Sequence, residues 1–118
     1  MAAANELRAG GVSQAYDRAR LIELFGDDAA VVAEIEREFL DTAREAAREI
    51  GGTDDLERIA QAAHRVKGAS GMIGAEGLRQ AAAAVEQAAK ARDLPAVRRL
   101  DAGLSDEVAR VAAQVAAS

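Results

Sequence analysis

The chain contains one histidine, His64, in a segment rich in small side chains. Lys67 follows it by three residues, and glycines follow at Gly68 and Gly71. On an α-helix, residues three and four positions apart lie side by side, so Lys67 and Gly68 would border the imidazole, as would Ala60 one turn earlier. We therefore expect the ring to stand over a shallow patch of small residues with a cation at its edge.

Phosphoryl transfer is one chemistry that an exposed imidazole beside a cation can perform. The ring is nucleophilic and protonatable near neutral pH, because the reference pKa of histidine is about 6.5. A phosphoryl group on a ring nitrogen stays transferable, and its transfer needs positioning and charge neutralisation more than covalent machinery. His64 is the candidate phosphoacceptor, and Lys67 is the candidate for neutralising phosphate oxygens. The alternative for Lys67 is an ordinary solvated lysine.

The two glycines are costly inside a helix. Each costs about 0.8–1.0 kcal/mol relative to alanine, which this chain uses freely elsewhere. One explanation is that a partner must approach the backbone closely beside His64. Gly68 and Gly71, together with Ala60 and Gln61, would then form the partner-docking surface. The alternative is that the glycines only fray the end of a helix.

Apolar residues recur every three or four positions along most of the chain, which is typical of amphipathic helices. The predicted helices span residues 13–25, 27–50, 54–73, 75–91 and 95–116. His64 falls in the third, roughly 110° from the centre of its apolar stripe and so on its exposed flank. Four long helices joined by short links predict an all-α fold, an antiparallel up-down four-helix bundle with a short extra N-terminal helix or arm.

The boundaries of these helices rest on glycines and acidic residues. Gly26 would end the first helix, and a glycine pair ending at Gly52 would end the second. Asp28 lies where the helix dipole favours an acid at the start of the second helix. Asp54 and Glu57 have capping-box spacing at the start of the third.

Residues 1–14 carry little periodic signal, and we expect a loose arm or a short helix there, followed by one domain over residues 15–118. In the first helix, the predicted apolar stripe consists of Ala15, Ala19, Ile22 and Phe25, together with Leu21. Leu40 lies outside the stripe of the second helix. It is either part of a wide buried face or an exposed contact for a partner.

The composition excludes several classes of function. The net charge is −5, with 20 acidic and 15 basic residues, which argues against nucleic-acid binding. The absence of cysteine excludes disulfides, thiolate metal sites and cysteine nucleophiles. No window approaches a membrane span of about 18 apolar residues, and the first residues lack the pattern of a signal peptide. We expect a cytoplasmic monomer that binds neither membrane nor nucleic acid.

The segment HRVKGASG at 64–71, followed by IGA at 73–75 and then Leu78, resembles the signature H-x-(L/I/V)-K-G-(S/A/G)-(S/A)-x-x-(L/I/V/F)-G-x-x-x-L. That signature belongs to the histidine-containing phosphotransfer (HPt) domains of two-component signalling. The resemblance covers about residues 17–117 and has further matches along the chain. These are Leu21, Leu24, Phe25, Gly26, Asp27, Phe39, Val85 and Glu86.

The resemblance implies a relay in which His64 accepts a phosphoryl group from a receiver-domain aspartate or a histidine kinase and passes it to another receiver. Mg²⁺ and the catalytic acids would come from the partner, so we expect no cofactor in this chain. No segment resembles an ATP-binding motif, so we expect no ATP binding.

Two further side chains have expected roles. Glu86, on the helix facing His64, could accept the N–H of the ring nitrogen that is not phosphorylated, which would fix the tautomer. Alternatively, it is a surface glutamate that pairs with Lys90 at i+4. Ser70 lies on the apolar stripe of the third helix, and we expect its hydroxyl to bind a nearby backbone group.

Two other functions compete with the relay. The chain could be a helical docking module for a receiver or kinase that carries no phosphate, although such a module has no need of His64 beside Lys67 and Gly68. It could also be a hydrolase with His64 as general base. One histidine and no cysteine leave little from which to build a nucleophile or a metal site.

Overall fold

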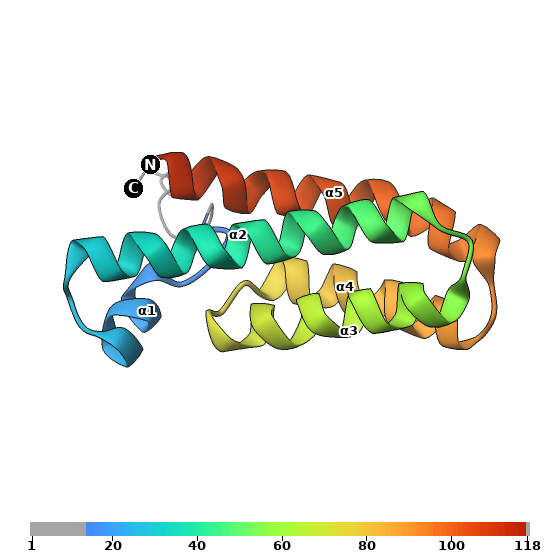
Figure 1. Cartoon of the computed structure of the whole chain (residues 1–118), viewed down its shortest axis with the longest axis horizontal. Coiled ribbons are helices and arrows are strands. Elements are labelled where there is room, and N and C mark those ends of the chain that lie inside the picture. Colours follow the sequence, from blue (N-terminus) through green and yellow to red (C-terminus); the bar gives the residue numbers. More distant parts are fainter. Residues whose placement is uncertain (1–13, 118) are drawn as a thin grey trace, which may run out of the picture.

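The computed structural model describes residues 14–117, which form five helices and no strand. They are α1 (Arg18–Phe25), α2 (Ala29–Gly52), α3 (Leu56–Met72), α4 (Glu76–Lys90) and α5 (Leu94–Ala117). The four long helices alternate in direction, and α1 lies at one end of the bundle under α2 (Figure 1). Each long helix packs against two others, since α2 and α4 both contact α3 and α5.

This arrangement confirms the predicted all-α fold, with a four-helix bundle and a short extra helix before it. Most of the predicted N-terminal arm, residues 1–13, lies outside the described residues. The division into an arm and a domain over residues 15–118 stays a prediction.

The core lies along the axis between the four long helices and is built from aliphatic and alanine side chains. Buried alanines such as Ala63 on α3 and Ala82 on α4 let those two helices lie close together, and they are the most extensively packed pair. Leu40 is buried, so α2 has the wider buried face. The larger fully buried apolar side chains are Leu21, Val32, Ile50, Ile59, Val66, Leu78, Val85, Val97, Leu104 and Val111.

Aspartates cap the first three helices. Asp28 Oδ1 accepts from the backbone N–H of Ala30, 3.0 Å away, at the start of α2. At the start of α3, however, the cap is Asp55, which accepts from the N–H of Glu57 at 3.0 Å. The predicted cap at Asp54 is therefore wrong by one residue, because the Asp54 carboxylate instead binds Arg98 of α5 at 2.7 Å.

Arg98 also closes the end of α2. Its guanidinium donates to the carbonyl oxygens of Ile50 at 2.9 Å and Thr53 at 2.6 Å, which the helix itself leaves without partners. The helix runs through the predicted glycine pair and ends at Gly52, with Thr53 as its extended cap. The glycine pair marks where α2 ends, and the hydrogen bonds from Arg98 of α5 stabilise that end.

The first helix is shorter than predicted and turns a different face inward. It begins at Arg18 rather than at residue 13, because Asp17 caps it and its own N–H donates to Ile73 O at 2.9 Å. Leu21 is fully buried, whereas Phe25 is 41% exposed and Ile22 lies at the surface as well. The predicted stripe is therefore correct at Leu21 and wrong at Ile22 and Phe25, because a helix of eight residues anchors itself mainly through Leu21.

The turn between α3 and α4 requires a glycine. Gly74 has φ +70°, a conformation that costs a side-chain-bearing residue about 1–2 kcal/mol. A Cβ there would also lie 3.0 Å from Asp17 Cβ. Gly68, by contrast, lies a full turn before the end of α3 at Met72, so the alternative of a frayed helix end does not hold for it, whereas Gly71 is the last residue but one of the helix.

No helix formed by residues 14–117 combines the length and the apolar character that crossing a membrane requires.

Candidate functional site

His64 lies in the middle of α3 with its imidazole at the molecular surface. Its neighbour Ala63 is fully buried, and so is Val66 two positions on, so the helix turns those side chains into the core. The imidazole is left on the flank of the helix, where the His64 side chain is 67% exposed. The predicted position beside the apolar stripe is confirmed.

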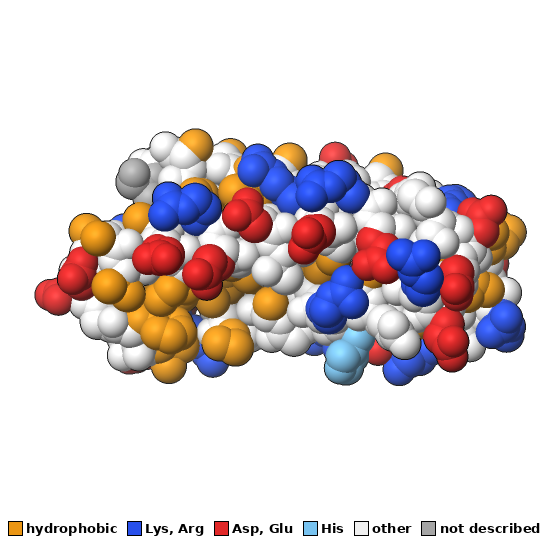
Figure 2. Space-filling view, in the orientation of Figure 1, with side chains coloured by type: hydrophobic (Ala, Val, Ile, Leu, Met, Phe, Trp, Pro, Cys, Tyr) orange, Lys and Arg blue, Asp and Glu red, His pale blue; other side chains and the backbone are white. Residues whose placement is uncertain are grey.

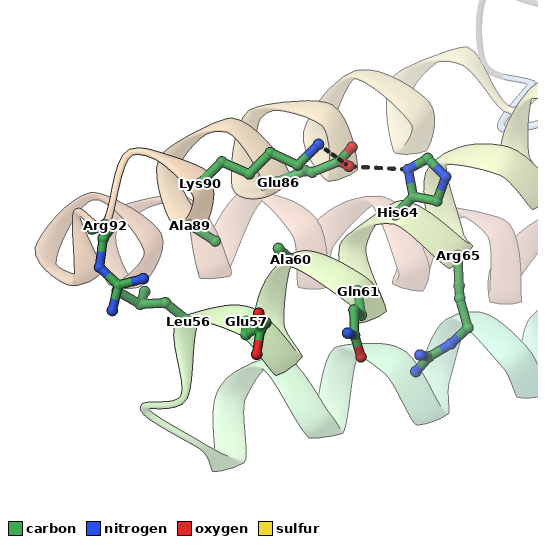
Figure 3. A pocket seen from close by; sticks show the side chains of 10 residues that line it. All are labelled: Leu56, Glu57, Ala60, Gln61, His64, Arg65, Glu86, Ala89, Lys90 and Arg92. Atoms are coloured by element: carbon green, nitrogen blue, oxygen red, sulfur yellow. Dashed lines mark hydrogen bonds and ion pairs between the residues drawn. The ribbon is translucent and has the colours of Figure 1, made fainter.

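Glu86 of α4 faces the imidazole across the gap between the two helices. Its Oε2 lies 3.0 Å from His64 Nδ1 (Figure 3). The same carboxylate binds Lys90 through Oε2 at 3.1 Å and Lys67 through Oε1 at 2.8 Å. Glu86 therefore contacts the ring and pairs with Lys90 at the same time, but it is buried and is not the surface glutamate of the second alternative.

The Glu86 side chain is only 5% exposed, which makes its charge state important. Burial by itself would raise the pKa of the carboxyl, but hydrogen bonds from Lys67, Lys90 and His64 outweigh it and lower the pKa to about 2. Glu86 is therefore ionised at neutral pH. An ionised carboxylate only accepts hydrogen bonds, so Nδ1 of the ring must be the donor.

This contact determines which nitrogen can act as a nucleophile. With the proton on Nδ1, the lone pair of the neutral ring is on Nε2. Among the residues that the structure describes, Nε2 has no hydrogen-bond partner. The site therefore presents a nucleophilic nitrogen, Nε2, toward solvent. On the Nδ1 side of the ring lies the Glu86 carboxylate, which also binds the cation of Lys67.

Arg65, next to His64 in the sequence, takes no part in this cluster. Its guanidinium binds Glu49 of α2 at 2.9 Å, and Arg58 binds the same carboxylate at 3.2 Å. A second ion-pair cluster therefore lies along the seam between α2 and α3, separate from the one around Glu86.

Gly68 and Gly71 have no side chains that would project from α3 beside His64. A Cβ on Gly68 would have no other atom within 4 Å, and a Cβ on Gly71 would make only ordinary contact, 3.8 Å from Arg79 Cδ. The fold therefore requires a glycine at neither position. Their predicted role in docking a partner stays a prediction.

A groove of about 650 Å³ runs from His64 toward the start of α3 and the end of α4 (Figure 3). Ala60 and Gln61 line it, whereas Gly68 and Gly71 do not, because they lie along α3 on the other side of His64. The predicted docking residues therefore flank the ring on two sides. The groove is lined by Leu56, Glu57, Ala60, Gln61, His64, Arg65, Glu86, Ala89, Lys90 and Arg92.

The structure has an apolar surface that was not predicted from the sequence. Leu24, Phe25 and Met72 are exposed, although each is a large hydrophobic residue. Hydrophobic side chains gather over α1, on the same face of the molecule as His64 (Figure 2). A helix of only eight residues with three large apolar side chains in its last four positions was the available signal, because so short a helix cannot bury them all.

Ser70 differs from its prediction. It is fully buried, and its Oγ has no hydrogen-bond partner within the described residues. The prediction of a bond from this hydroxyl to the backbone is therefore wrong. The backbone carbonyl of Ser70 instead accepts from Ala75 N–H at 2.9 Å, across the turn that leads into α4.

Within residues 14–117, no group of three or more histidine and acidic side chains is arranged to hold a metal ion. The described chain is thus a four-helix bundle that exposes one imidazole in contact with a buried carboxylate. The family model for the Hpt domain matches residues 20–114 of this chain. A comparison with curated proteins finds no match.

The chain belongs to the Hpt domain family. The match spans most of the sequence and includes the imidazole, both lysines and the carboxylate described above. The chain therefore has a phosphotransfer-related role in two-component signalling, where Hpt domains interact with receiver domains and kinases.

Proposed function

We propose that the protein is a phosphohistidine carrier in which His64 Nε2 accepts a phosphoryl group from a receiver aspartate or a histidine kinase and passes it to another receiver. The observation that carries this proposal is the 3.0 Å contact between Nδ1 and the ionised, buried Glu86. That contact leaves the nucleophilic lone pair on the solvent-facing nitrogen.

The chemical step balances without a proton donor from this chain. The Nε2 lone pair attacks the phosphorus of an aspartyl phosphate, and the P–N bond forms as the P–O bond breaks. The electron pair of that bond stays on the aspartate carboxylate. The ring keeps its Nδ1 proton and becomes a cation, which the negative charge of Glu86 stabilises. The reverse step returns the phosphoryl group to another aspartate.

Lys67 supplies the positive charge that the phosphoryl oxygens need. It is half-buried and binds Glu86 Oε1 at 2.8 Å, close to the ring. Its flexible stem allows the ammonium group to move from the carboxylate to a phosphoryl group on Nε2. We propose that Mg²⁺ and the acidic residues of the transfer site come from the receiver, so that this chain acts without a cofactor.

The docking surface on each side of His64 supports a protein partner rather than a small substrate. Gly68 and Gly71 keep the backbone of α3 accessible beside the ring, and Ala60 and Gln61 line the groove on the other side. A receiver can therefore bring its aspartate close to Nε2 without meeting a large side chain on α3.

The test is phosphorylation of the wild-type chain and of His64→Gln by a phosphorylated receiver or by phosphoramidate, a small-molecule phosphodonor. The wild type should acquire one phosphoryl group that is labile in acid and stable in base, and His64→Gln should acquire none. Circular dichroism of both proteins checks that the fold is kept.

Label on His64→Gln, or label that survives acid, would contradict the proposal. A wild-type chain that binds a receiver but takes no label from any donor would instead be the docking module that carries no phosphate.

A further inference from the structure

The Glu86 carboxylate is bound by cations from two different helices. Lys67 of α3 binds Oε1 at 2.8 Å, while Lys90 of α4 binds Oε2 at 3.1 Å. Oε2 is also the oxygen that accepts from His64 Nδ1, at 3.0 Å. Lys90 and His64 approach this oxygen from opposite sides (Figure 3). Each of the two carboxylate oxygens of Glu86 therefore binds a different lysine.

The choice of residue type at these two positions is unusual within the chain. Lys67 and Lys90 are the only lysines in the sequence, and all its other strongly basic residues are arginines. Both lysines bind one and the same carboxylate. Lysine is a compact charge on a flexible stem, whereas arginine favours fixed, two-pronged contacts.

Phosphoryl transfer would change the partners of this carboxylate. When Lys67 leaves Oε1 for the phosphoryl oxygens, Glu86 loses one of its two cations. A carboxylate with 5% of its surface exposed is costly to leave without a cation. Lys90 keeps a cation on the carboxylate when Lys67 leaves, because it binds the second oxygen, Oε2, and comes from the same helix as Glu86.

We propose that Lys90 is a positioning residue, which keeps Glu86 ionised and in contact with Nδ1 of His64 while Lys67 exchanges the carboxylate for the phosphoryl group. This inference rests on the proposed function. An ordinary Glu–Lys pair at i, i+4 stabilises an exposed helix by about 0.2–0.5 kcal/mol and does nothing more. The pair of Glu86 and Lys90 differs because its carboxylate is buried and orients an imidazole on another helix.

The first experiment follows the Glu86 carboxyl carbon by NMR during an acid titration of the unphosphorylated chain. In the wild type the pKa of Glu86 is held at about 2. Lys90→Ala should raise the midpoint by about one pH unit, because one of three hydrogen-bond donors is lost. Lys90→Arg should stay within a few tenths of a unit of the wild type. Arg99→Ala, which removes one exposed cation from α5, is the matched control and should not move the midpoint.

The second experiment measures the rate at which the same four proteins are labelled by phosphoramidate and by a phosphorylated receiver. We expect Lys90→Ala to be labelled about tenfold more slowly than the wild type, which corresponds to about 1.4 kcal/mol. Lys90→Arg should recover most of the rate, and Arg99→Ala should match the wild type.

The proposal needs both effects. A Lys90→Ala protein with a shifted Glu86 midpoint and a wild-type rate would overturn it, because the pair would then be merely structural. A slower rate with an unshifted midpoint would overturn it too. If the wild type takes no label from either donor, the proposed function fails instead, and the NMR titration shows this separately because it needs no phosphate.

Discussion

At the scale of single residues, the buried carboxylate of Glu86 determines what His64 can do. A neutral histidine on a helix flank can adopt two tautomers, and only the one with its proton on Nδ1 leaves Nε2 free to attack. The ionised carboxylate at 3.0 Å from Nδ1 selects that tautomer. It also places a negative charge where the ring becomes positive during transfer. In the proposed carrier, Glu86 is therefore the residue that orients His64 for transfer.

Replacing Glu86 with glutamine should change stability in a pH-dependent way. The pKa of Glu86 is about 2 in the folded protein and about 4.5 without the fold, so the unfolded chain binds more protons between these values. The contribution of the carboxylate is therefore fully present above about pH 4.5 and is lost as the pH falls toward 2. We expect the free energy of unfolding of Glu86→Gln to be lower than that of the wild type by about 1–3 kcal/mol at pH 7.

Urea denaturation of both proteins from pH 7 down to pH 2.5 measures this difference. It should shrink steadily below about pH 4.5, where the wild-type carboxylate loses its advantage over the amide. A difference that stays constant over the whole range would show that the charge of Glu86 does not stabilise the fold.

At the scale of elements, α3 carries glycine next to His64, where alanine would make the helix more stable. Gly68 is an interior helical residue with open space where a side chain would be, so nothing in the isolated fold requires glycine there. The turn at Gly74 is different, because its φ of +70° and the nearby Asp17 both exclude a side chain. Of these two glycines, Gly74 is explained by the fold, whereas we propose that Gly68 gives a partner access to the ring.

Substitutions at Gly68 should therefore separate stability from transfer. Gly68→Ala should raise the free energy of unfolding by about 0.8–1.0 kcal/mol, because alanine is the better helix former. Gly68→Gln should also fold stably, yet should slow transfer from a phosphorylated receiver by about tenfold or more through steric exclusion. Chemical denaturation and receiver-dependent labelling are the two measurements, and phosphoramidate labelling is the control that needs no docked protein. A Gly68→Gln protein labelled by the receiver at the wild-type rate would rule out close docking at this position.

At the scale of the whole molecule, the two ends of the described chain hold each other in place. Gln114 of α5 accepts from the backbone N–H of Ala15 at 2.6 Å and of Tyr16 at 3.2 Å, and it donates to Tyr16 O at 3.1 Å. The Tyr16 ring is buried, and its hydroxyl donates to the buried carboxylate of Glu36 on α2. Residues from the start and the end of the bundle therefore share one hydrogen-bonded cluster.

Tyr16→Phe should destabilise the fold without affecting the site. Loss of the hydroxyl leaves the buried Glu36 carboxylate without one of its donors, although Arg18 still binds it at 3.2 Å. We expect the free energy of unfolding to fall by about 1–3 kcal/mol, as measured by urea denaturation at pH 7. The rate at which phosphoramidate labels His64 should not change. An equally stable Tyr16→Phe protein would show that this hydrogen bond contributes nothing to the bundle.

Local spacing along the sequence was enough to predict the helices, the antiparallel bundle and the exposed flank on which His64 lies. These properties depend on intervals of three and four residues within one helix, which the sequence states directly. The same intervals identified Lys67 and Gly68 as neighbours of the ring. The resemblance to HPt domains rested on those residues and is confirmed by the family match.

Contacts between helices required the three-dimensional arrangement. The cap at Asp55 rather than Asp54 depends on Arg98, which is 44 residues from Asp54 in the sequence. The double role of Glu86 depends on the height and rotation of α4 against α3, and the buried face of α1 depends on where Leu21 meets the bundle. Sequence periodicity describes how each helix is patterned, but the free energy of packing several helices together decides which side chains meet between them.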